Sequence, residues 1–253
     1  MSGGSRVRGI FFDLDDTLIH YTHAERAALT AGCRLANQLR PEINERGLAL
    51  ALLEIYGEQY THGTEGYVEL ATLTVDEFRM RITGEALRLF GIDDPDLTAT
   101  LVAAYRKAEA EALRAFAYAD EVLTQLRPRF YLGIITNGPS STQREKIAAV
   151  SIADRFDAIL VDTEFGCPKP DPRLFAHAAR RAELTPSELI FVGNSLEADI
   201  EGARRAGWTS VWLNADGEDL PPDAPIPDYT IASLDELLTL PPIVAALDGT
   251  KSV

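Results

Sequence analysis

The chain has 253 residues, 46% of them hydrophobic, which is enough for one large domain or for a core domain that carries a smaller one. Its formal net charge of -15 repels the phosphate backbone of nucleic acids and argues against a general nucleic-acid binder. No apolar run approaches the roughly 18 residues that span a bilayer, and no signal sequence is visible at the N-terminus. We therefore expect a cytoplasmic protein without a membrane partner. Small phosphorylated molecules fit this charge if a metal neutralises their site.

Short apolar runs recur along the chain with little of the alternation expected for a strand that has one solvent-exposed face. They are Gly9–Phe12, Tyr131–Ile135, Ala158–Val161, Leu189–Val192 and Ser210–Leu213, with a possible last strand at Asp228–Ile231. Stretches with a helical pattern, 141–150, 172–182 and 196–206, lie between or after these runs. Because strand and helix alternate, the sequence predicts an α/β fold with a doubly wound parallel sheet.

The segment between residues 20 and 116 breaks this alternation, because it contains no convincing strand. Two stripes of helical period run through it: Phe78, Ile82, Ala86, Leu89 and Leu97, Leu101, Ala104, Ala108. Breaks near Pro41, at 62–64 and at 91–95 divide the segment into roughly four helices. We therefore expect a helical cap domain over 20–116, inserted into an α/β core formed by 1–19 and 117–253.

Asp13 and Asp15 stand two residues apart at the end of the first predicted strand. The pleat of an extended chain sends both side chains to the same side, so two carboxylates share one small volume. Such a pair is costly unless a proton or a cation separates the charges, and Mg²⁺ with oxygen ligands is the natural partner. The alternative is an ordinary acidic turn after a strand.

Polar side chains follow three other predicted strands at the equivalent place. Thr136, Asn137 and Gly138 follow the second strand, Lys169 follows the third, and Asn194 and Asp199 follow the fourth. Open α/β sheets place their ligands at the carboxyl ends of parallel strands. Together with the aspartate pair, the set offers a nucleophile, a proton-transfer group, phosphate-binding groups and oxygen ligands for a cation. Each residue alone has an ordinary structural explanation, such as a helix cap or a solvated loop cation.

These motifs, in this order, resemble those of the haloacid dehalogenase (HAD) superfamily, in its phosphatase branch with a helical cap. The resemblance runs from Phe11 to about Leu213 and begins with the segment Asp13-Leu14-Asp15-Asp16-Thr17. It implies Mg²⁺-dependent hydrolysis of a phosphate monoester of a small metabolite, such as a nucleotide, a sugar phosphate or a small phosphorylated acid.

The resemblance also implies a role for each motif residue. Asp13 would be the nucleophile that becomes an aspartyl phosphate, and Asp15 the general acid and base. Thr136 and Lys169 would bind the transferring phosphoryl group, beside Asn137 and Gly138. Mg²⁺ would be held by Asp13, by the main-chain carbonyl of Asp15, and by the fourth motif through Asn194 and Asp199.

One departure from the family pattern affects the metal. The family most often has Asp where this chain has Asn194, and an amide oxygen brings no charge to the metal site, so we expect weaker metal binding or a larger share of the metal binding for Asp199.

Three alternative functions remain open: a haloacid dehalogenase, which lacks the second acidic residue, a phosphomutase, or a catalytically weak ligand-binding protein. A signalling receiver domain is disfavoured by motif order and by the helical insertion. Candidate substrate contacts in the cap are His20, Tyr21, His23, Tyr60, His62, Tyr67, Arg79 and Arg81.

Overall fold

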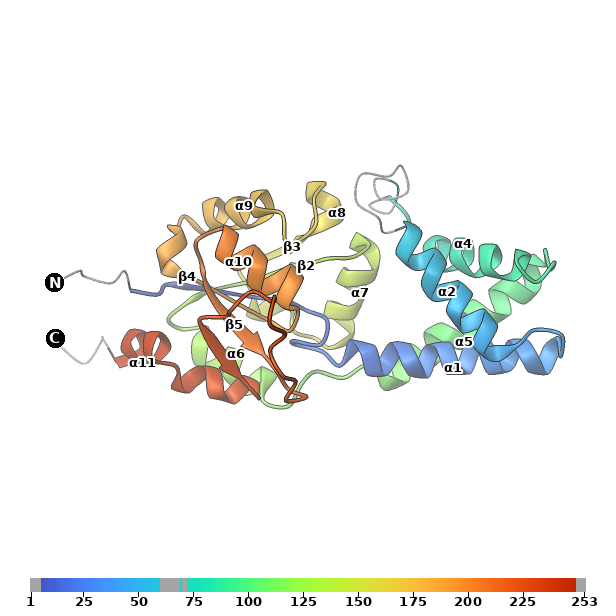
Figure 1. Cartoon of the computed structure of the whole chain (residues 1–253), viewed down its shortest axis with the longest axis horizontal. Coiled ribbons are helices and arrows are strands. Elements are labelled where there is room, and N and C mark those ends of the chain that lie inside the picture. Colours follow the sequence, from blue (N-terminus) through green and yellow to red (C-terminus); the bar gives the residue numbers. More distant parts are fainter. Residues whose placement is uncertain (1–5, 60–68, 70–71, 249–253) are drawn as a thin grey trace. The chain divides into compact units, whose positions relative to one another are not determined.

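The computed structural model describes residues 6–59, 69 and 72–248 of the chain (Figure 1). The expected helix break at 62–64 and the cap candidates Tyr60, His62 and Tyr67 lie outside these residues. Within them, every helix is too short or too polar to cross a bilayer. The chain divides into two compact units, and each is described by itself.

The first unit comprises residues 1–19, 115–137 and 150–253 and contains a parallel sheet. In the described residues the sheet has six strands in the order β3-β2-β1-β4-β5-β6. The strands are β1 Gly9–Phe12, β2 Tyr131–Thr136, β3 Ala158–Val161, β4 Leu189–Gly193, β5 Thr209–Leu213 and β6 Tyr229–Ile231. All neighbouring strands pair in parallel, so the predicted doubly wound α/β fold is confirmed.

The register of the sheet decides where its polar strand ends meet. Phe12, the last residue of β1, lies opposite Ile134 of β2 and Val192 of β4. The chain runs from β1 outward through β2 and β3 on one side, and later through β4, β5 and β6 on the other. The carboxyl end of β1 is therefore the point where the strand order reverses, and a crevice forms at such a point in open α/β sheets.

The strands read as continuous apolar runs because helices cover both faces of the sheet. On one face, α9 (Pro172–Ala182) packs against α10 (Glu201–Arg205), and Phe175 joins Phe11, Phe191 and Trp208 in an aromatic core. On the other face lies α6 (Ala119–Leu126), in contact with η4 (Leu234–Thr239) (Figure 1). The remaining helices of this unit in the described residues are η1 Ala153–Arg155, α8 Asp162–Phe165, η2 Pro186–Glu188, η3 Leu196–Ile200 and α11 Pro241–Asp248.

The second unit, residues 20–114 with 138–149, is helical in the part that the structure describes. Its helices are α1 Tyr21–Leu39, α2 Glu45–Gln59, α4 Val75–Arg88, α5 Pro95–Ala112 and α7 Ser140–Ala149. A capping box of Thr74 and Glu77 begins α4, and Asp94 caps α5 just before a proline. Residues 138–149 lie in the range expected for the core domain, yet they group with the helices of this second unit.

The two predicted apolar stripes are only partly buried. Phe78, Ile82 and Ala86 lie in the interior of the helical unit, whereas Leu89 is 69% exposed because the helix ends at residue 88. In α5 the buried face carries Leu97, Leu101, Val102 and Tyr105, while Ala104 and Ala108 are half-buried. The buried face of α5 is thus rotated from the predicted one toward Tyr105.

Candidate active site

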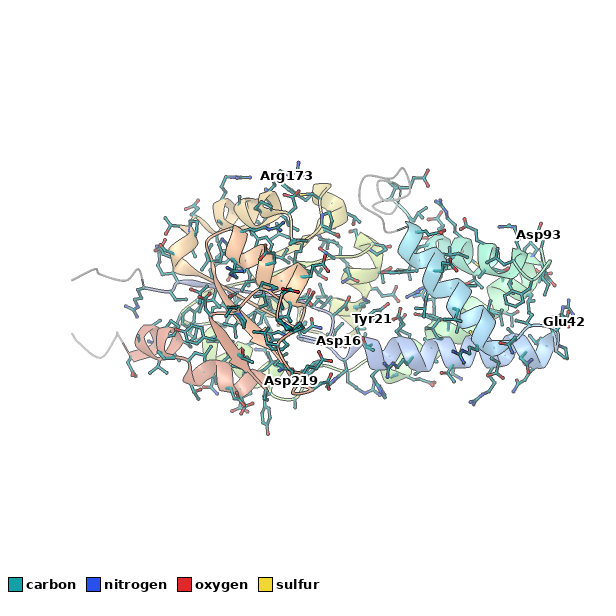
Figure 2. The ribbon with its side chains drawn as sticks, in the orientation of Figure 1. Asp16, Tyr21, Glu42, Asp93, Arg173 and Asp219 are labelled. Carbon is teal, nitrogen blue, oxygen red and sulfur yellow. The ribbon has the colours of Figure 1, made fainter. Side chains whose placement is uncertain are left out.

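Asp13 and Asp15 lie in the turn that directly follows β1. The Asp13 N–H donates to the carbonyl of Val192, which ties the start of the turn to β4 at 2.9 Å. Asp16, labelled in Figure 2, has a φ of 55°, and its N–H donates to the Ile19 carbonyl at 2.8 Å. Aspartate is among the residues that adopt this left-handed conformation most readily. The turn holds Asp15 close enough for its charge to raise the pKa of Asp13.

Lys169 joins two of the predicted site residues through its ammonium group. Its Nζ lies 2.5 Å from Asp13 Oδ1 and 2.7 Å from Asp199 Oδ1. The side chains of Lys169, Asp13 and Asp199 are 2%, 9% and 1% exposed, respectively. Residues from the end of β1, from η3 after β4 and from the loop after α8 therefore meet in one buried ionic cluster.

Burial dominates the electrostatics of this cluster. Desolvation raises the pKa of Asp13 from 3.8 to about 7, the charge of Lys169 opposes this rise, and the carboxylates of Asp199 and Asp15 add to it. Burial alone would lower the pKa of Lys169, but the carboxylates of Asp13 and Asp199 outweigh it, so the pKa of Lys169 is raised. The lysine therefore stays charged, and Asp13 exchanges its proton near neutral pH.

The segment after β4 holds the Asp199 carboxylate in place with one direct hydrogen bond, from Ser195, which also caps the turn that carries Asp199. The Ser195 N–H donates to Asp199 Oδ2 at 2.9 Å, and the Ser195 hydroxyl accepts from the Ala198 N–H at 3.1 Å. A Cβ atom on Gly193 would lie 2.3 Å from Asp199 Oδ2. Glycine at this position therefore leaves the space that the Asp199 carboxylate needs in order to reach Lys169.

Asn137 positions the lysine through the main chain. Its Nδ2 donates to the Lys169 carbonyl at 3.1 Å, and the Lys169 N–H donates to Asn137 Oδ1 at 2.9 Å. Both polar atoms of the Asn137 amide thus form hydrogen bonds with the main chain of Lys169. Before it, Thr136 is buried at the end of β2, and after it Gly138 has a φ of 144°, a value that favours glycine. Gly138 belongs to the helical unit.

Asn194 is fixed by two neighbours. Its Oδ1 accepts from the Thr17 hydroxyl at 3.3 Å, and its carbonyl accepts from Trp212 Nε1 at 2.9 Å. Thr17 is fully buried, and sequence reasoning gave it no role. The sequence offered one signal for Thr17, its hydroxyl two positions after Asp15. Its partner Asn194 is too distant in sequence for the contact to be predicted.

The groups that the motifs assign to the metal fit a hard cation. A carboxylate, the main-chain carbonyl of Asp15 and the amide oxygen of Asn194 are all oxygen donors, as Mg²⁺ prefers. In residues 6–59, 69 and 72–248 no three His, Cys, Asp or Glu side chains are grouped as metal ligands, so a metal here would rely partly on neutral oxygens. A cation beside Asp13 would also favour its ionised form, against the effect of burial.

A family model of the haloacid dehalogenase-like hydrolases matches residues 7–207. The chain belongs to this family. The resemblance inferred from the motifs is thereby confirmed, and so is the expectation of a hydrolase. Two curated relatives are phosphatases. N-acylneuraminate-9-phosphatase of Homo sapiens is 30% identical over 99% of both chains. Glyceraldehyde 3-phosphate phosphatase of Methanopyrus kandleri is 31% identical over 92% of this chain and 96% of its own.

Two solved HAD structures match nearly the whole chain. A HAD hydrolase from Bacillus subtilis, solved with bound magnesium, is 27% identical with a TM-score of 0.65, covering 93% of this chain and 98% of its own. A 2-haloacid dehalogenase from Pseudomonas syringae is 26% identical with a TM-score of 0.68, covering 94% of this chain and 98% of its own. Proteins similar to this chain thus include both phosphatases and a haloacid dehalogenase.

Proposed function

We propose that this HAD hydrolase uses Mg²⁺ to hydrolyse a phosphate monoester of a small metabolite through an aspartyl phosphate on Asp13. The single observation that carries the proposal is the buried Asp13–Lys169–Asp199 cluster at the carboxyl end of β1. A lysine held against the nucleophile balances its charge and is available to phosphoryl oxygens. The phosphatases among the curated relatives support a phosphate ester as substrate.

In the first step, a carboxylate oxygen of Asp13 attacks phosphorus in line with the ester oxygen. The bond from phosphorus to the ester oxygen breaks, and Asp15 gives a proton to the leaving alkoxide. Lys169 and Thr136 stabilise the charge on the equatorial oxygens. Asn137 supports this step by fixing the main chain of Lys169 with its two hydrogen bonds.

In the second step, water hydrolyses the aspartyl phosphate. Asp15, now ionised, removes a proton from the water as its oxygen attacks phosphorus. The bond between phosphorus and Asp13 breaks, which regenerates the Asp13 carboxylate and releases inorganic phosphate. When bound, Mg²⁺ offsets negative charge on the phosphoryl group. Asp13, the Asp15 carbonyl and Asn194 would hold it, while Asp199 uses its two oxygens on Lys169 and the Ser195 N–H.

Dehalogenation is the second candidate, because a 2-haloacid dehalogenase shares the scaffold. Asp15 favours phosphate esters over halides, because a leaving halide needs no proton whereas a leaving alkoxide does. A phosphomutase would differ only in what accepts the phosphoryl group from Asp13. Release of inorganic phosphate, of halide, or of neither therefore separates these reactions.

The test uses an aryl phosphate with and without Mg²⁺, followed by a panel of phosphorylated metabolites. We expect Asp13→Asn to abolish phosphate release. Asp15→Asn should slow the second step more than the first for an aryl ester, whose leaving group needs little protonation. Intact-protein mass spectrometry should then detect one added phosphoryl group that is absent in Asp13→Asn.

Asp16→Asn is the matched control. It changes an adjacent acidic residue in the same turn, and Asn tolerates the same left-handed backbone conformation. Its turnover should stay close to wild type. Phosphate release by a clean preparation of Asp13→Asn at the wild-type rate would refute Asp13 as the nucleophile.

A further inference from the structure

A cluster of polar and aromatic side chains lies inside the helical unit, apart from the residues of the proposed reaction. Arg79 of α4 is 7% exposed and Tyr105 of α5 is 8% exposed. The Arg79 guanidinium carbon lies 4.2 Å from the centroid of the Tyr105 ring, a cation–π contact. Buried arginines are rare unless they are paired, so this one calls for an explanation of what it binds.

The pairing of Arg79 is incomplete. Its Nη2 lies 3.3 Å from Glu109 Oε1, but its buried Nε has no hydrogen-bond partner within the described ranges. The buried hydroxyl of Tyr105 has none either in the same part of the chain. Leaving a buried donor unsatisfied costs about 1 to 3 kcal/mol, so two such groups on facing side chains indicate that an acceptor binds between them.

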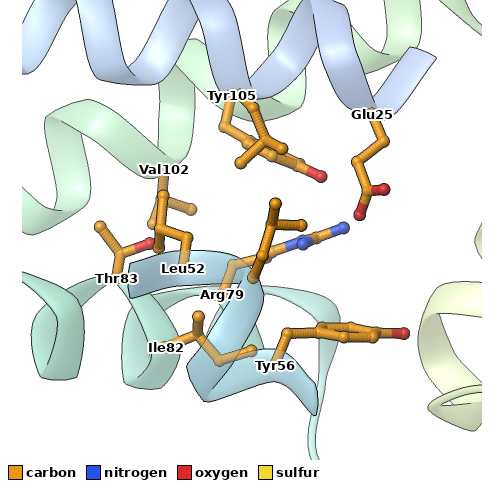
Figure 3. A pocket seen from close by; sticks show the side chains of 10 residues that line it. Glu25, Leu52, Tyr56, Arg79, Ile82, Thr83, Val102 and Tyr105 are labelled. Carbon is orange, nitrogen blue, oxygen red and sulfur yellow. The ribbon is translucent and has the colours of Figure 1, made fainter. Parts of the chain in front are cut away.

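A small cavity adjoins these two side chains. Its volume is about 30 Å³, whereas a single water needs roughly 10 to 15 Å³, so it has room for about two water-sized atoms, the size of the two oxygens of a carboxylate. Figure 3 shows the Arg79 guanidinium directed toward Glu25, with Tyr105 on one side and Tyr56 on the other. Most of the remaining wall is aliphatic: Leu29, Leu52, Leu53, Ile82 and Val102.

The acidic groups nearby have partners of their own. Glu25 Oε1 accepts from the hydroxyl of Tyr21 at 3.2 Å, and Glu109 is paired with Arg79. Burial raises the pKa of Glu109, against the charges of Arg79 and Lys146. Neutralising Glu109 is therefore easier than for an exposed glutamate, which allows Arg79 to accept a second carboxylate.

We propose that this cavity binds a small carboxylate of the size of formate, with Arg79 and Tyr105 as its hydrogen-bond donors and the aliphatic wall excluding water around it. A charged donor in an apolar cavity gives a strong bond to an anionic oxygen. Arginine is also the side chain best suited to carboxylates. The proposal concerns the helical unit alone and does not depend on phosphate ester hydrolysis.

The test is a ligand-observed NMR titration of the full chain with formate and with formamide, its uncharged analogue. We expect formate to bind at least about ten-fold more tightly, equivalent to about 1.4 kcal/mol. Arg79→Gln should weaken formate binding by at least about ten-fold, and Tyr105→Phe by roughly three- to ten-fold, as loss of one hydrogen bond implies. Circular dichroism checks that both variants are folded. If Arg79→Gln is unfolded, the binding result for Tyr105→Phe tests the proposal instead.

Arg81→Gln is the matched control, because Arg81 lies on the same helix with its side chain 34% exposed and pairs with Glu69 and Glu85. Its formate affinity should stay within about two-fold of wild type, since a surface ion pair contributes little. Equal binding of formate and formamide, or no formate binding at all, would overturn the proposal. So would formate binding that inorganic phosphate displaces and that Arg79→Gln leaves unchanged, which would place the anion at Lys169.

Discussion

Lys169 allows the sharpest test of the proposed site, because two buried carboxylates share its one ammonium group. Lys169→Met keeps most of the side-chain volume and removes the charge that lies 2.5 Å from Asp13 Oδ1. Loss of an adjacent opposite charge raises the pKa of a carboxyl group by roughly 1 to 3 units. Burial already raises the pKa of Asp13 to about 7, so without bound Mg²⁺ the variant should hold Asp13 protonated at neutral pH.

The size of the effect follows from the ionised fraction of Asp13. For a rise of roughly two units, that fraction falls from about three quarters to about one thirtieth at a pH about half a unit above the wild-type pKa of Asp13 under the assay conditions. Ionisation of the nucleophile alone then lowers kcat/KM by about 25-fold. Loss of the contact to phosphoryl oxygens should add to this at every pH.

The assay is kcat/KM for an aryl phosphate as a function of pH, at one saturating Mg²⁺ concentration, since Mg²⁺ lowers the pKa of Asp13 in both proteins. In Lys169→Met the acidic limb of the profile should move to higher pH by roughly 1 to 3 units. Lys169→Arg, which keeps the charge, should move it less. An unshifted limb, with the same fractional loss at every pH, would refute the electrostatic role of Lys169.

Three further predictions concern the same cluster. Gly193→Ala should displace Asp199 and lower kcat by more than about ten-fold, whereas Gly57→Ala, whose added Cβ meets nothing within 4 Å, should leave kcat unchanged. Asn194→Asp should bind Mg²⁺ several-fold more tightly in calorimetric titrations, because it adds a charged ligand; unchanged affinity would argue against Asn194 as a ligand. Because the pKa of Asp13 is raised on folding, its contribution to stability is greatest at low pH and is lost as pH rises from about 4 to about 7. Denaturant unfolding of Asp13→Asn should therefore lack this part of the pH dependence, and an identical pH dependence in both proteins would contradict the raised pKa.

Much of the sheet could be predicted because each central strand is buried on both faces and reads as an apolar run. The grouping of the candidate residues followed from one further rule, that parallel strands bring their carboxyl ends to one edge of a sheet. Lys169 and Asp13 are far apart in sequence and yet lie in contact for this reason. Their catalytic roles remain proposals.

Details that depend on side-chain direction could not be predicted. The amide of Asn137 turns to the main chain of Lys169, and the hydroxyl of Thr17 turns to Asn194, contacts that no spacing in the sequence encodes. In α5 the apolar pattern indicated a face with Ala104, whereas the structure buries Tyr105, which contacts Arg79. A helical period cannot reveal a polar residue whose partner lies on another helix.

The neutral side chain of Asn194 has a consequence for Asp13 as well as for the metal. Asp15 and Asp199 already raise the pKa of Asp13, in addition to the effect of burial. A carboxylate at position 194, directly after β4, the strand next to β1, would add another negative charge and raise that pKa further whenever the metal is absent. Compared with an aspartate, Asn194 would therefore weaken the attraction for Mg²⁺ but ease ionisation of the proposed nucleophile, Asp13. It follows that the metal-free pKa of Asp13 should be higher in Asn194→Asp than in wild type, even though the variant binds Mg²⁺ more tightly.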